Sequence, residues 1–351
     1  MQNYWIVALV LLGVTPGVVR AQDEAFKRAF ALYQAGSFED AHQVLSAVEQ
    51  NKYSALDLSL LGTIEFQTGD LARAEQHLRS ALSKEPGLAG ARSTLTHVLL
   101  ELARVRNLRG NGEAALAAAL EAQRISPSDP AILYAVGVLC LQMDLIKDAT
   151  ANLERAATLD PNPATLYALA SARIANRDLE SAGKIYGGML KRDPDNAQVN
   201  YALGATYFLE SQNEAAKPYF ERSLSLQPDQ VESIYYLGLI ADQSGDKEKS
   251  IEALKKVLVH SPDHVRAHIA LGMEYRSLGL LNESRIELET AVRLSPESQK
   301  AHYQLGLVLN ALKEQHGAKK ELDIANQLRT SSDERISWQL LLNASHGTET
   351  Q

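Results

Sequence analysis

Three histidines in the C-terminal half are the residues whose type and spacing first suggest chemistry. His260, His264 and His268 recur at every fourth residue, so on one continuous helix they would share a face as three metal ligands. Pro262 falls among them, and proline stops a helix because it lacks an N–H and its ring clashes with the preceding turn. We therefore expect His260 to end one helix and His268 to lie in the next. The sequence predicts no metal site and no cofactor.

Signatures of catalysis are also missing from the sequence. It contains no P-loop, no G-x-G-x-x-G, no H-E-x-x-H and no G-x-S-x-G motif. The single cysteine, Cys140, excludes an internal disulfide framework and a cysteine-rich metal site. It stands between Leu139 and Leu141, which favours a small residue of the core over a reactive thiol. We predict that the protein is not an enzyme.

Composition and charge narrow the class of partner. The 351 residues are 45% hydrophobic and 22% charged, which is typical of a folded protein with a substantial core. The formal net charge is -8 and no run of Lys and Arg occurs. Phosphate recognition requires a basic surface, so the sequence argues against nucleic acid and against an anionic membrane as partners.

The N-terminus is typical of an export signal. Tyr4 to Val14 is apolar and uncharged, Pro16 and Gly17 interrupt it, and Ala21 completes a small-residue cleavage site. The apolar stretch is shorter than the roughly 20 residues that a spanning helix needs. Residues 1–21 are thus predicted to be a signal peptide of a periplasmic or secreted protein, with no stable membrane insertion after cleavage. An uncleaved N-terminal membrane anchor is the alternative.

Prolines mark an internal repeat with a period near 34 residues. The successive spacings are 34, 33, 34, 34 and 34 for Pro127, Pro161, Pro194, Pro228, Pro262 and Pro296. Between them, each unit is expected to form two helices joined by a short turn, as at 198–210 and 214–226. From Pro86 to Pro127 the spacing is 41, seven more than the period. Seven residues make about two helical turns, so we expect a lengthened first helix from about Ala91 that keeps its buried face.

Two positions in every unit are restricted to small residues. The eighth position holds Ala29, Gly62, Ala103, Gly137, Ala170, Gly204, Gly238, Gly272 and Gly306. The twentieth position, on the second helix, holds Ala41, Ala74, Ala115, Ala149, Ala182, Ala216, Ser250, Ser284 and Ala318. Small residues at matching positions of two helices indicate that the helices approach each other closely there.

At these residues the chain resembles the tetratricopeptide repeat family, most clearly from Tyr201 to Pro228 and from Ile269 to Pro296. The resemblance implies an all-α, right-handed superhelical solenoid of about nine helical hairpins, with a concave face lined mainly by the first helices. Glycine is expected at the turn between the helices of a hairpin, and it is found at Gly36, Gly69, Gly110, Gly245 and Gly279. Other residues stand at four of these turns: Asp144, Arg177, Ser211 and Lys313.

The predicted domain organisation follows from this period. A tetratricopeptide solenoid covers 22–330 and a C-terminal capping helix with a loose tail covers 331–351. The units are expected near 22–54, 55–88, 89–129, 130–162, 163–196, 197–230, 231–264, 265–298 and 299–330.

Candidate partner-binding residues lie on the first helices, where positions two, five, nine and twelve should face the groove. Tyrosine recurs at position five, at Tyr134, Tyr167, Tyr201, Tyr235 and Tyr303. A tyrosine offers a rigid apolar ring and a hydroxyl, which suits contact with an extended peptide. Packing between repeats is the alternative role. At position two, Arg266 and Lys300 would place positive charge at the C-terminal end of the groove.

We predict from these features a non-enzymatic protein–protein interaction scaffold of the cell envelope or exterior. It would bind a partner protein or an extended peptide in the concave groove. One alternative is a structural component that self-associates, and another is a carbohydrate-binding module that uses the tyrosines as a platform.

Overall fold

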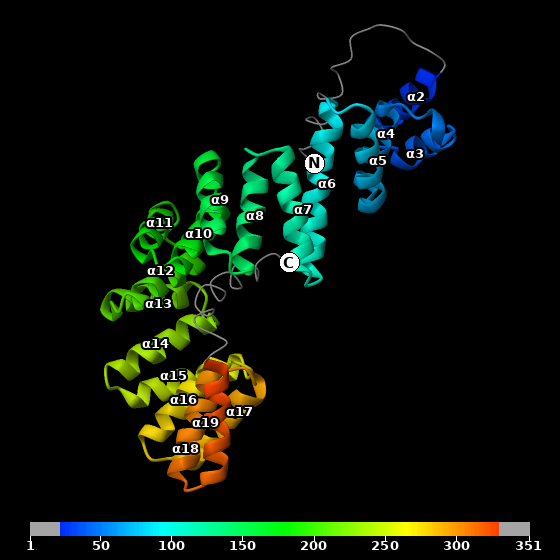
Figure 1. Cartoon of the computed structure of the whole chain (residues 1–351). Coiled ribbons are helices and arrows are strands. Elements are labelled where there is room, and N and C mark those ends of the chain that lie inside the picture. Colours follow the sequence, from blue (N-terminus) through cyan, green and yellow to red (C-terminus); the bar gives the residue numbers. More distant parts are fainter. Residues whose placement is uncertain (1–21, 330–351) are drawn as a thin grey trace. The chain divides into compact units, whose positions relative to one another are not determined.

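The computed structural model describes residues 22–329, which form 18 α-helices and one short 3-10 helix and contain no β-strand (Figure 1). Consecutive helices pair into nine hairpins within this range, so the predicted all-α fold of repeated hairpins is confirmed. The described residues divide into two compact units, 22–160 and 161–329. The predicted signal peptide and the predicted capping helix fall outside the described residues.

The first unit holds four hairpins. They are α2 (Gln22–Gln34) with α3 (Phe38–Ser46), α4 (Ala55–Thr68) with α5 (Leu71–Lys84), α6 (Ala89–Leu108) with α7 (Gly112–Ile125), and α8 (Pro130–Gln142) with α9 (Ile146–Leu159). A short 3-10 helix, η1 (Gln50–Lys52), lies between α3 and α4.

The second unit holds five hairpins. They are α10 (Pro163–Ala175) with α11 (Leu179–Arg192), α12 (Ala197–Leu209) with α13 (Asn213–Leu226), α14 (Val231–Gln243) with α15 (Lys247–His260), α16 (Val265–Ser277) with α17 (Leu281–Leu294), and α18 (Gln299–Ala311) with α19 (Gln315–Arg329). The helices expected at 198–210 and 214–226 are α12 and α13.

The close approach within each hairpin occurs at the two small positions. A methyl group added to Gly272 of α16 would lie 2.6 Å from Cγ of Leu288 on α17. The hydroxyl of Ser284, the small residue of α17, donates a hydrogen bond of 2.6 Å to the carbonyl of Gly272. A methyl group added to Gly62, Gly137 or Gly306 would likewise lie 2.5 to 2.7 Å from Cγ of a leucine on the partner helix. The glycine thus makes room for a large side chain on the facing helix.

The turns between paired helices share one backbone conformation. All five expected turn glycines have positive φ, from 75° to 86°. The four non-glycine residues at the same repeat position adopt it too, with φ of 62° at Asp144, 60° at Arg177, 60° at Ser211 and 65° at Lys313. Because Cβ crowds the carbonyl in this region, each of the four stores about 1–2 kcal/mol of strain. The packing of the hairpin, rather than the turn residue, therefore sets the turn.

The lengthened helix predicted in the third hairpin is α6. It has 20 residues, against 13 in α8, the next first helix along the chain, and the difference equals the seven-residue excess in the proline spacing. Its added turns keep a buried face through Ala91 and Leu95. Thr94 on this face lies 3.4 Å, hydroxyl to hydroxyl, from Thr63 of α4. The insertion therefore preserves packing against the preceding hairpin.

Replacement of Gly272 by alanine should destabilise the second unit by about 1–3 kcal/mol, because the new methyl group overlaps Leu288. The matched control is Gly188→Ala in α11, where nothing lies within 4 Å of the added methyl group. That change should raise stability by about 0.5–1 kcal/mol, since alanine is the better helix former. Urea unfolding followed by circular dichroism measures both, and equal effects would contradict the packing role.

Replacement of Lys313 by glycine should stabilise the protein by about 0.5–1 kcal/mol, because glycine relieves the positive-φ strain at the turn of the last described hairpin. Gly245→Ala, at the equivalent turn of another hairpin, should have the opposite sign. Thermal unfolding of the two variants tests this pair. A decrease in the midpoint for Lys313→Gly would contradict the assignment.

Candidate functional site

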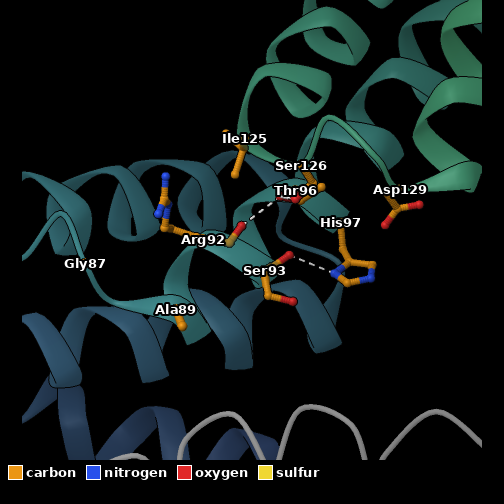
Figure 2. Close-up of a pocket in the computed structure, with 9 residues that line it drawn as sticks. All are labelled: Gly87, Ala89, Arg92, Ser93, Thr96, His97, Ile125, Ser126 and Asp129. Carbon is orange, nitrogen blue, oxygen red and sulfur yellow. Dashed lines mark hydrogen bonds between the residues drawn. The ribbon is translucent and has the colours of Figure 1, made fainter. Parts of the chain in front are cut away.

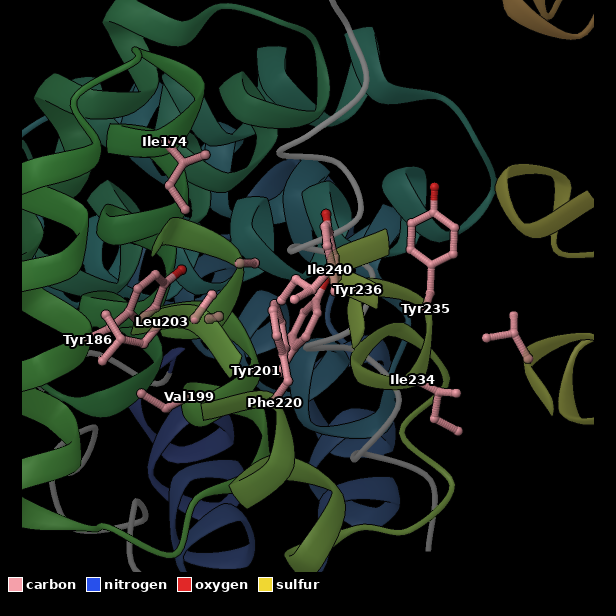
Figure 3. Close-up of a cluster of buried hydrophobic side chains, with 14 of the residues drawn as sticks. Ile174, Tyr186, Val199, Tyr201, Leu203, Phe220, Ile234, Tyr235, Tyr236 and Ile240 are labelled. Atoms are coloured by element: carbon pink, nitrogen blue, oxygen red, sulfur yellow. The ribbon is translucent and has the colours of Figure 1, made fainter. Parts of the chain in front are cut away.

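The position-five tyrosines of the second unit lie mainly inside the packing between hairpins. Tyr201 is only 1% exposed, and Tyr167 and Tyr235 are also buried. Figure 3 shows Tyr201 of α12 beside Phe220 of α13 and Tyr236 of α14. The rings of Phe220 and Tyr236 stack with centroids 5.2 Å apart. Burial raises the pKa of Tyr167 and of Tyr235 to about 12.

Two members of the tyrosine series differ from these three. Tyr134 in the first unit is half-buried, and Tyr303 in the last described hairpin is 44% exposed. The structure therefore does not bring the five rings together as one exposed ladder. Contact of these tyrosines with a partner stays a prediction, and it can involve little of the surface of Tyr201.

Polar side chains link the first helices at position two. The amide nitrogen of Gln198 donates to the hydroxyl of Tyr167 at 2.8 Å. The amide nitrogen of Gln230, at the N-cap of α14, donates to the side-chain oxygen of Gln198 at 3.2 Å. Gln198 and Gln230 are both half-buried, so part of each amide reaches the surface.

A charged group continues this row on α14 and α16. The guanidinium of Arg266 donates to the carboxylate of Glu232 and lies 4.6 Å from the ring centre of Tyr235. His264 lies 3.2 Å from the same carboxylate. Burial favours the neutral acid, but the hydrogen bond from His264 and the charge of Arg266 hold the pKa of Glu232 below its ordinary value. The positive charge predicted at Arg266 is thus already neutralised by Glu232.

Lys300 is the other predicted cation at position two. It is exposed on α18 and forms no ion pair with any residue that the structure describes. Positive charge at this end of the row therefore resides on Lys300.

An apolar row runs beside the polar one. Position nine holds Leu239 on α14, Met273 on α16 and Leu307 on α18, all half-buried. Position twelve of the same helices holds Asp242, Arg276 and Asn310. Because positions two, nine and twelve share a side of a helix, we call these rows on α14, α16 and α18 the first-helix face. Sequence reasoning did not single out the apolar row, although its members are spaced 34 residues apart.

The three histidines do not share one helix, as expected from Pro262. His260 ends α15, His264 caps α16 through an N–H bond of 3.0 Å from Ala267, and His268 lies within α16. Nδ1 of His268 is 2.6 Å from Glu287, and Nε2 is 2.9 Å from the carbonyl of Pro262. Within residues 22–329 no three His, Cys, Asp or Glu side chains form a group suited to a metal ion.

The bonds of His268 recur one repeat later. His302 contacts Glu321 at 2.6 Å and the carbonyl of Pro296 at 2.9 Å. Since both partners of His268 are acceptors, both ring nitrogens must donate, and only the charged ring can do so. Burial alone would favour the neutral ring, but the bonds to Glu287 and to Pro262 raise the pKa of His268 above 6.5.

Cys140 is buried within α8, as the sequence predicts. Burial raises the pKa of its thiol to about 11, so the thiolate needed for reactivity is scarce at neutral pH.

Comparison with known protein families identifies the repeat. A family model described as "Tetratricopeptide repeat" matches residues 197–230, 231–263 and 265–298, and a second with the same description matches 26–89. No curated protein sequence matches the chain. None of the helices within residues 22–329 is both long and apolar enough to cross a membrane.

Several solved structures share the fold at low sequence identity. A tetratricopeptide repeat protein from Parabacteroides merdae is 17% identical, with a TM-score of 0.57, and the match covers 71% of this chain and 98% of that one. The Cut9–Hcn1 complex of the APC/C matches with 15% identity and a TM-score of 0.54, covering 92% and 83%. The Pseudomonas aeruginosa protein pilF matches with 18% identity and a TM-score of 0.50, covering 60% and 96%.

The charge on His268 makes the stability of the second unit depend on pH. Because the folded pKa is raised, its stabilising contribution is complete below 6.5 and is lost as the pH rises through the higher folded value. Asn200 occupies the same repeat position and donates to the carbonyl of Pro194 at 3.0 Å without titrating. His268→Asn should therefore lose stability at pH 6 but match the wild type more closely at pH 9.

Urea unfolding of both proteins at the two pH values measures this difference. Glu287 bonds to His268, Arg293 acts on it through its charge, and both residues are kept in the variant. A stability difference that does not change with pH would show that His268 acts only by packing.

Proposed function

We propose that the chain, in which residues 26–89, 197–263 and 265–298 match tetratricopeptide repeat models, is a non-enzymatic scaffold that holds an extended segment of a partner protein on the first-helix face. Proteins with this repeat are generally non-enzymatic scaffolds, and the fold is associated with protein or peptide partners. The sequence of residues 1–21 supports a location in the periplasm or outside the cell.

The observation that carries the proposal is the layout of the first-helix face. Leu239, Met273 and Leu307 leave part of their apolar surface in contact with water, and a partner that covers them gains about 25 cal/mol for each Å² removed from water. The partly accessible amide of Gln198 and the exposed ammonium of Lys300 offer polar groups to a peptide backbone or side chain. An apolar strip with polar edges suits an extended peptide segment.

Self-association is a second candidate function, because second helices carry large apolar side chains that are exposed to water. Val259 of α15 and Ile286 of α17 are 78% and 61% exposed, and both lie on second helices. A carbohydrate platform has less support, since the rings of Tyr167, Tyr201 and Tyr235 are buried and stacking requires open ring faces.

Peptides selected from a random displayed library against the full chain should bind the first-helix face. The variant Leu239→Ser with Met273→Ser should weaken such binding at least about tenfold, because it removes two apolar contacts. The control Val259→Ser with Ile286→Ser makes the same chemical change on second helices and should leave affinity unchanged. Fluorescence anisotropy measures affinity, and circular dichroism checks folding.

Equal binding by both variants would refute the assignment to the first-helix face. Absence of any selected peptide, together with concentration-dependent assembly that the Val259 and Ile286 variant abolishes, would support self-association instead. Analytical ultracentrifugation of the same proteins gives the assembly state.

A further inference from the structure

The first unit contains a small open pocket beside α6, with a volume of about 260 Å³ (Figure 2). One wall is the N-terminal half of α6 and the other is the loop between α7 and α8. The polar residues that line it are Arg92, Ser93, Thr96, His97, Ser126 and Asp129.

The pocket follows from the seven added residues of α6. Thr96 corresponds to the first residue of an ordinary first helix, and its hydroxyl lies 3.5 Å from that of Ser126 in the α7–α8 loop. The added helical turns of α6 that precede Thr96 extend beyond this contact, and the pocket lies between these turns and the α7–α8 loop. Ala91 and Leu95 anchor these turns in the core, so the wall of the pocket belongs to the packed structure.

Polar side chains line the pocket from both walls. Figure 2 shows Arg92 toward one end, His97 and Asp129 toward the other, and the side chains of Ser93, Thr96 and Ser126 between them. The Nδ1 atom of His97 donates to the carbonyl of Ser93 at 2.8 Å, which fixes the orientation of the ring. The hydroxyl of Thr96 is used within α6, where it donates to the carbonyl of Arg92 at 2.8 Å.

Of the two charged side chains that line the pocket, Asp129 has neighbouring groups that offset its charge and Arg92 has none among residues 22–329. Asp129 caps α8, and its carboxylate accepts hydrogen bonds from the N–H groups of Ala131 at 2.9 Å and Ile132 at 3.4 Å. The positive end of the α8 dipole therefore offsets this negative charge. The guanidinium of Arg155 binds the carbonyl of Pro127 in the same loop at 2.7 Å and adds positive charge nearby.

Arg92 has no such compensation. Its side chain is exposed, and among residues 22–329 it takes part in no ion pair. A guanidinium at the edge of a pocket is suited to a carboxylate, which it can bind through two parallel hydrogen bonds.

We propose that this pocket binds an aspartate or glutamate side chain of a partner segment, with Arg92 as the ionic partner and the hydroxyls of Ser93 and Ser126 as additional donors. The volume is below the roughly 300–1,000 Å³ of small-molecule sites, which favours one side chain over a free metabolite. The inference rests on the proposed function, because it assumes that the partner is a peptide segment.

The test uses the full chain and the displayed random-peptide library. Selected peptides should carry an acidic residue whose replacement by the matching amide weakens binding about tenfold. Arg92→Gln should weaken binding by the same factor, and the two changes together should cause no further loss. Arg104→Gln is the matched control, because Arg104 lies on α6 but pairs with Glu101 at 2.8 Å outside the pocket.

A charge exchange gives the strictest form of the test. Arg92→Glu should reject the acidic peptide and bind its lysine counterpart more tightly than the wild type does. Selected acidic peptides that bind Arg92→Gln as well as Arg104→Gln would overturn this inference alone. Competition by inorganic phosphate without any selected acidic peptide would also overturn it, in favour of a simple anion site. A library that yields no binder would overturn the proposed function as well.

Discussion

The close approach of two helices inside each hairpin is the constraint on which the rest of the structure depends. A glycine or alanine at position eight leaves space that a large side chain of the facing helix fills, as Leu288 does against Gly272. The partner small residue, such as Ser284, lies fully buried at the same crossing. Once this contact is made in every hairpin, the buried side of each first helix is fixed. The side that remains is free to vary, and it carries the candidate functions.

Much of the fold could be predicted from the sequence because every hairpin must satisfy the same contact. Repetition exposes the constraint as a period, and prolines such as Pro228 mark where each second helix has ended. Even the exception was predictable, since an insertion of seven residues preserves the buried face of α6. The left-handed turns at Asp144, Arg177, Ser211 and Lys313 also follow from the repeat, because position in the hairpin outweighs the preference of the residue.

The candidate site was less predictable, since accessibility depends on side chains from the next hairpin. Tyr201 has the spacing of a groove residue, but Tyr236 packs against its ring and leaves it almost no exposed surface. Arg266 resembled a free cation, but Glu232 lies one repeat earlier and binds it. That pairing could have been inferred from the 34-residue separation of the two residues. The pocket at Arg92 could not, because it depends on where the α7–α8 loop meets a helix of unusual length.

We propose that recognition uses surfaces that the packing constraint leaves unused, with a partner segment covering the apolar row of the first-helix face. Covalent labelling of side chains, read by mass spectrometry with and without a selected peptide, tests this most directly. We expect the peptide to reduce labelling of Leu239, Met273 and Leu307 and to leave labelling of Val259 and Ile286 unchanged. Reduced labelling of Val259 and Ile286, with the apolar row still fully labelled, would contradict it.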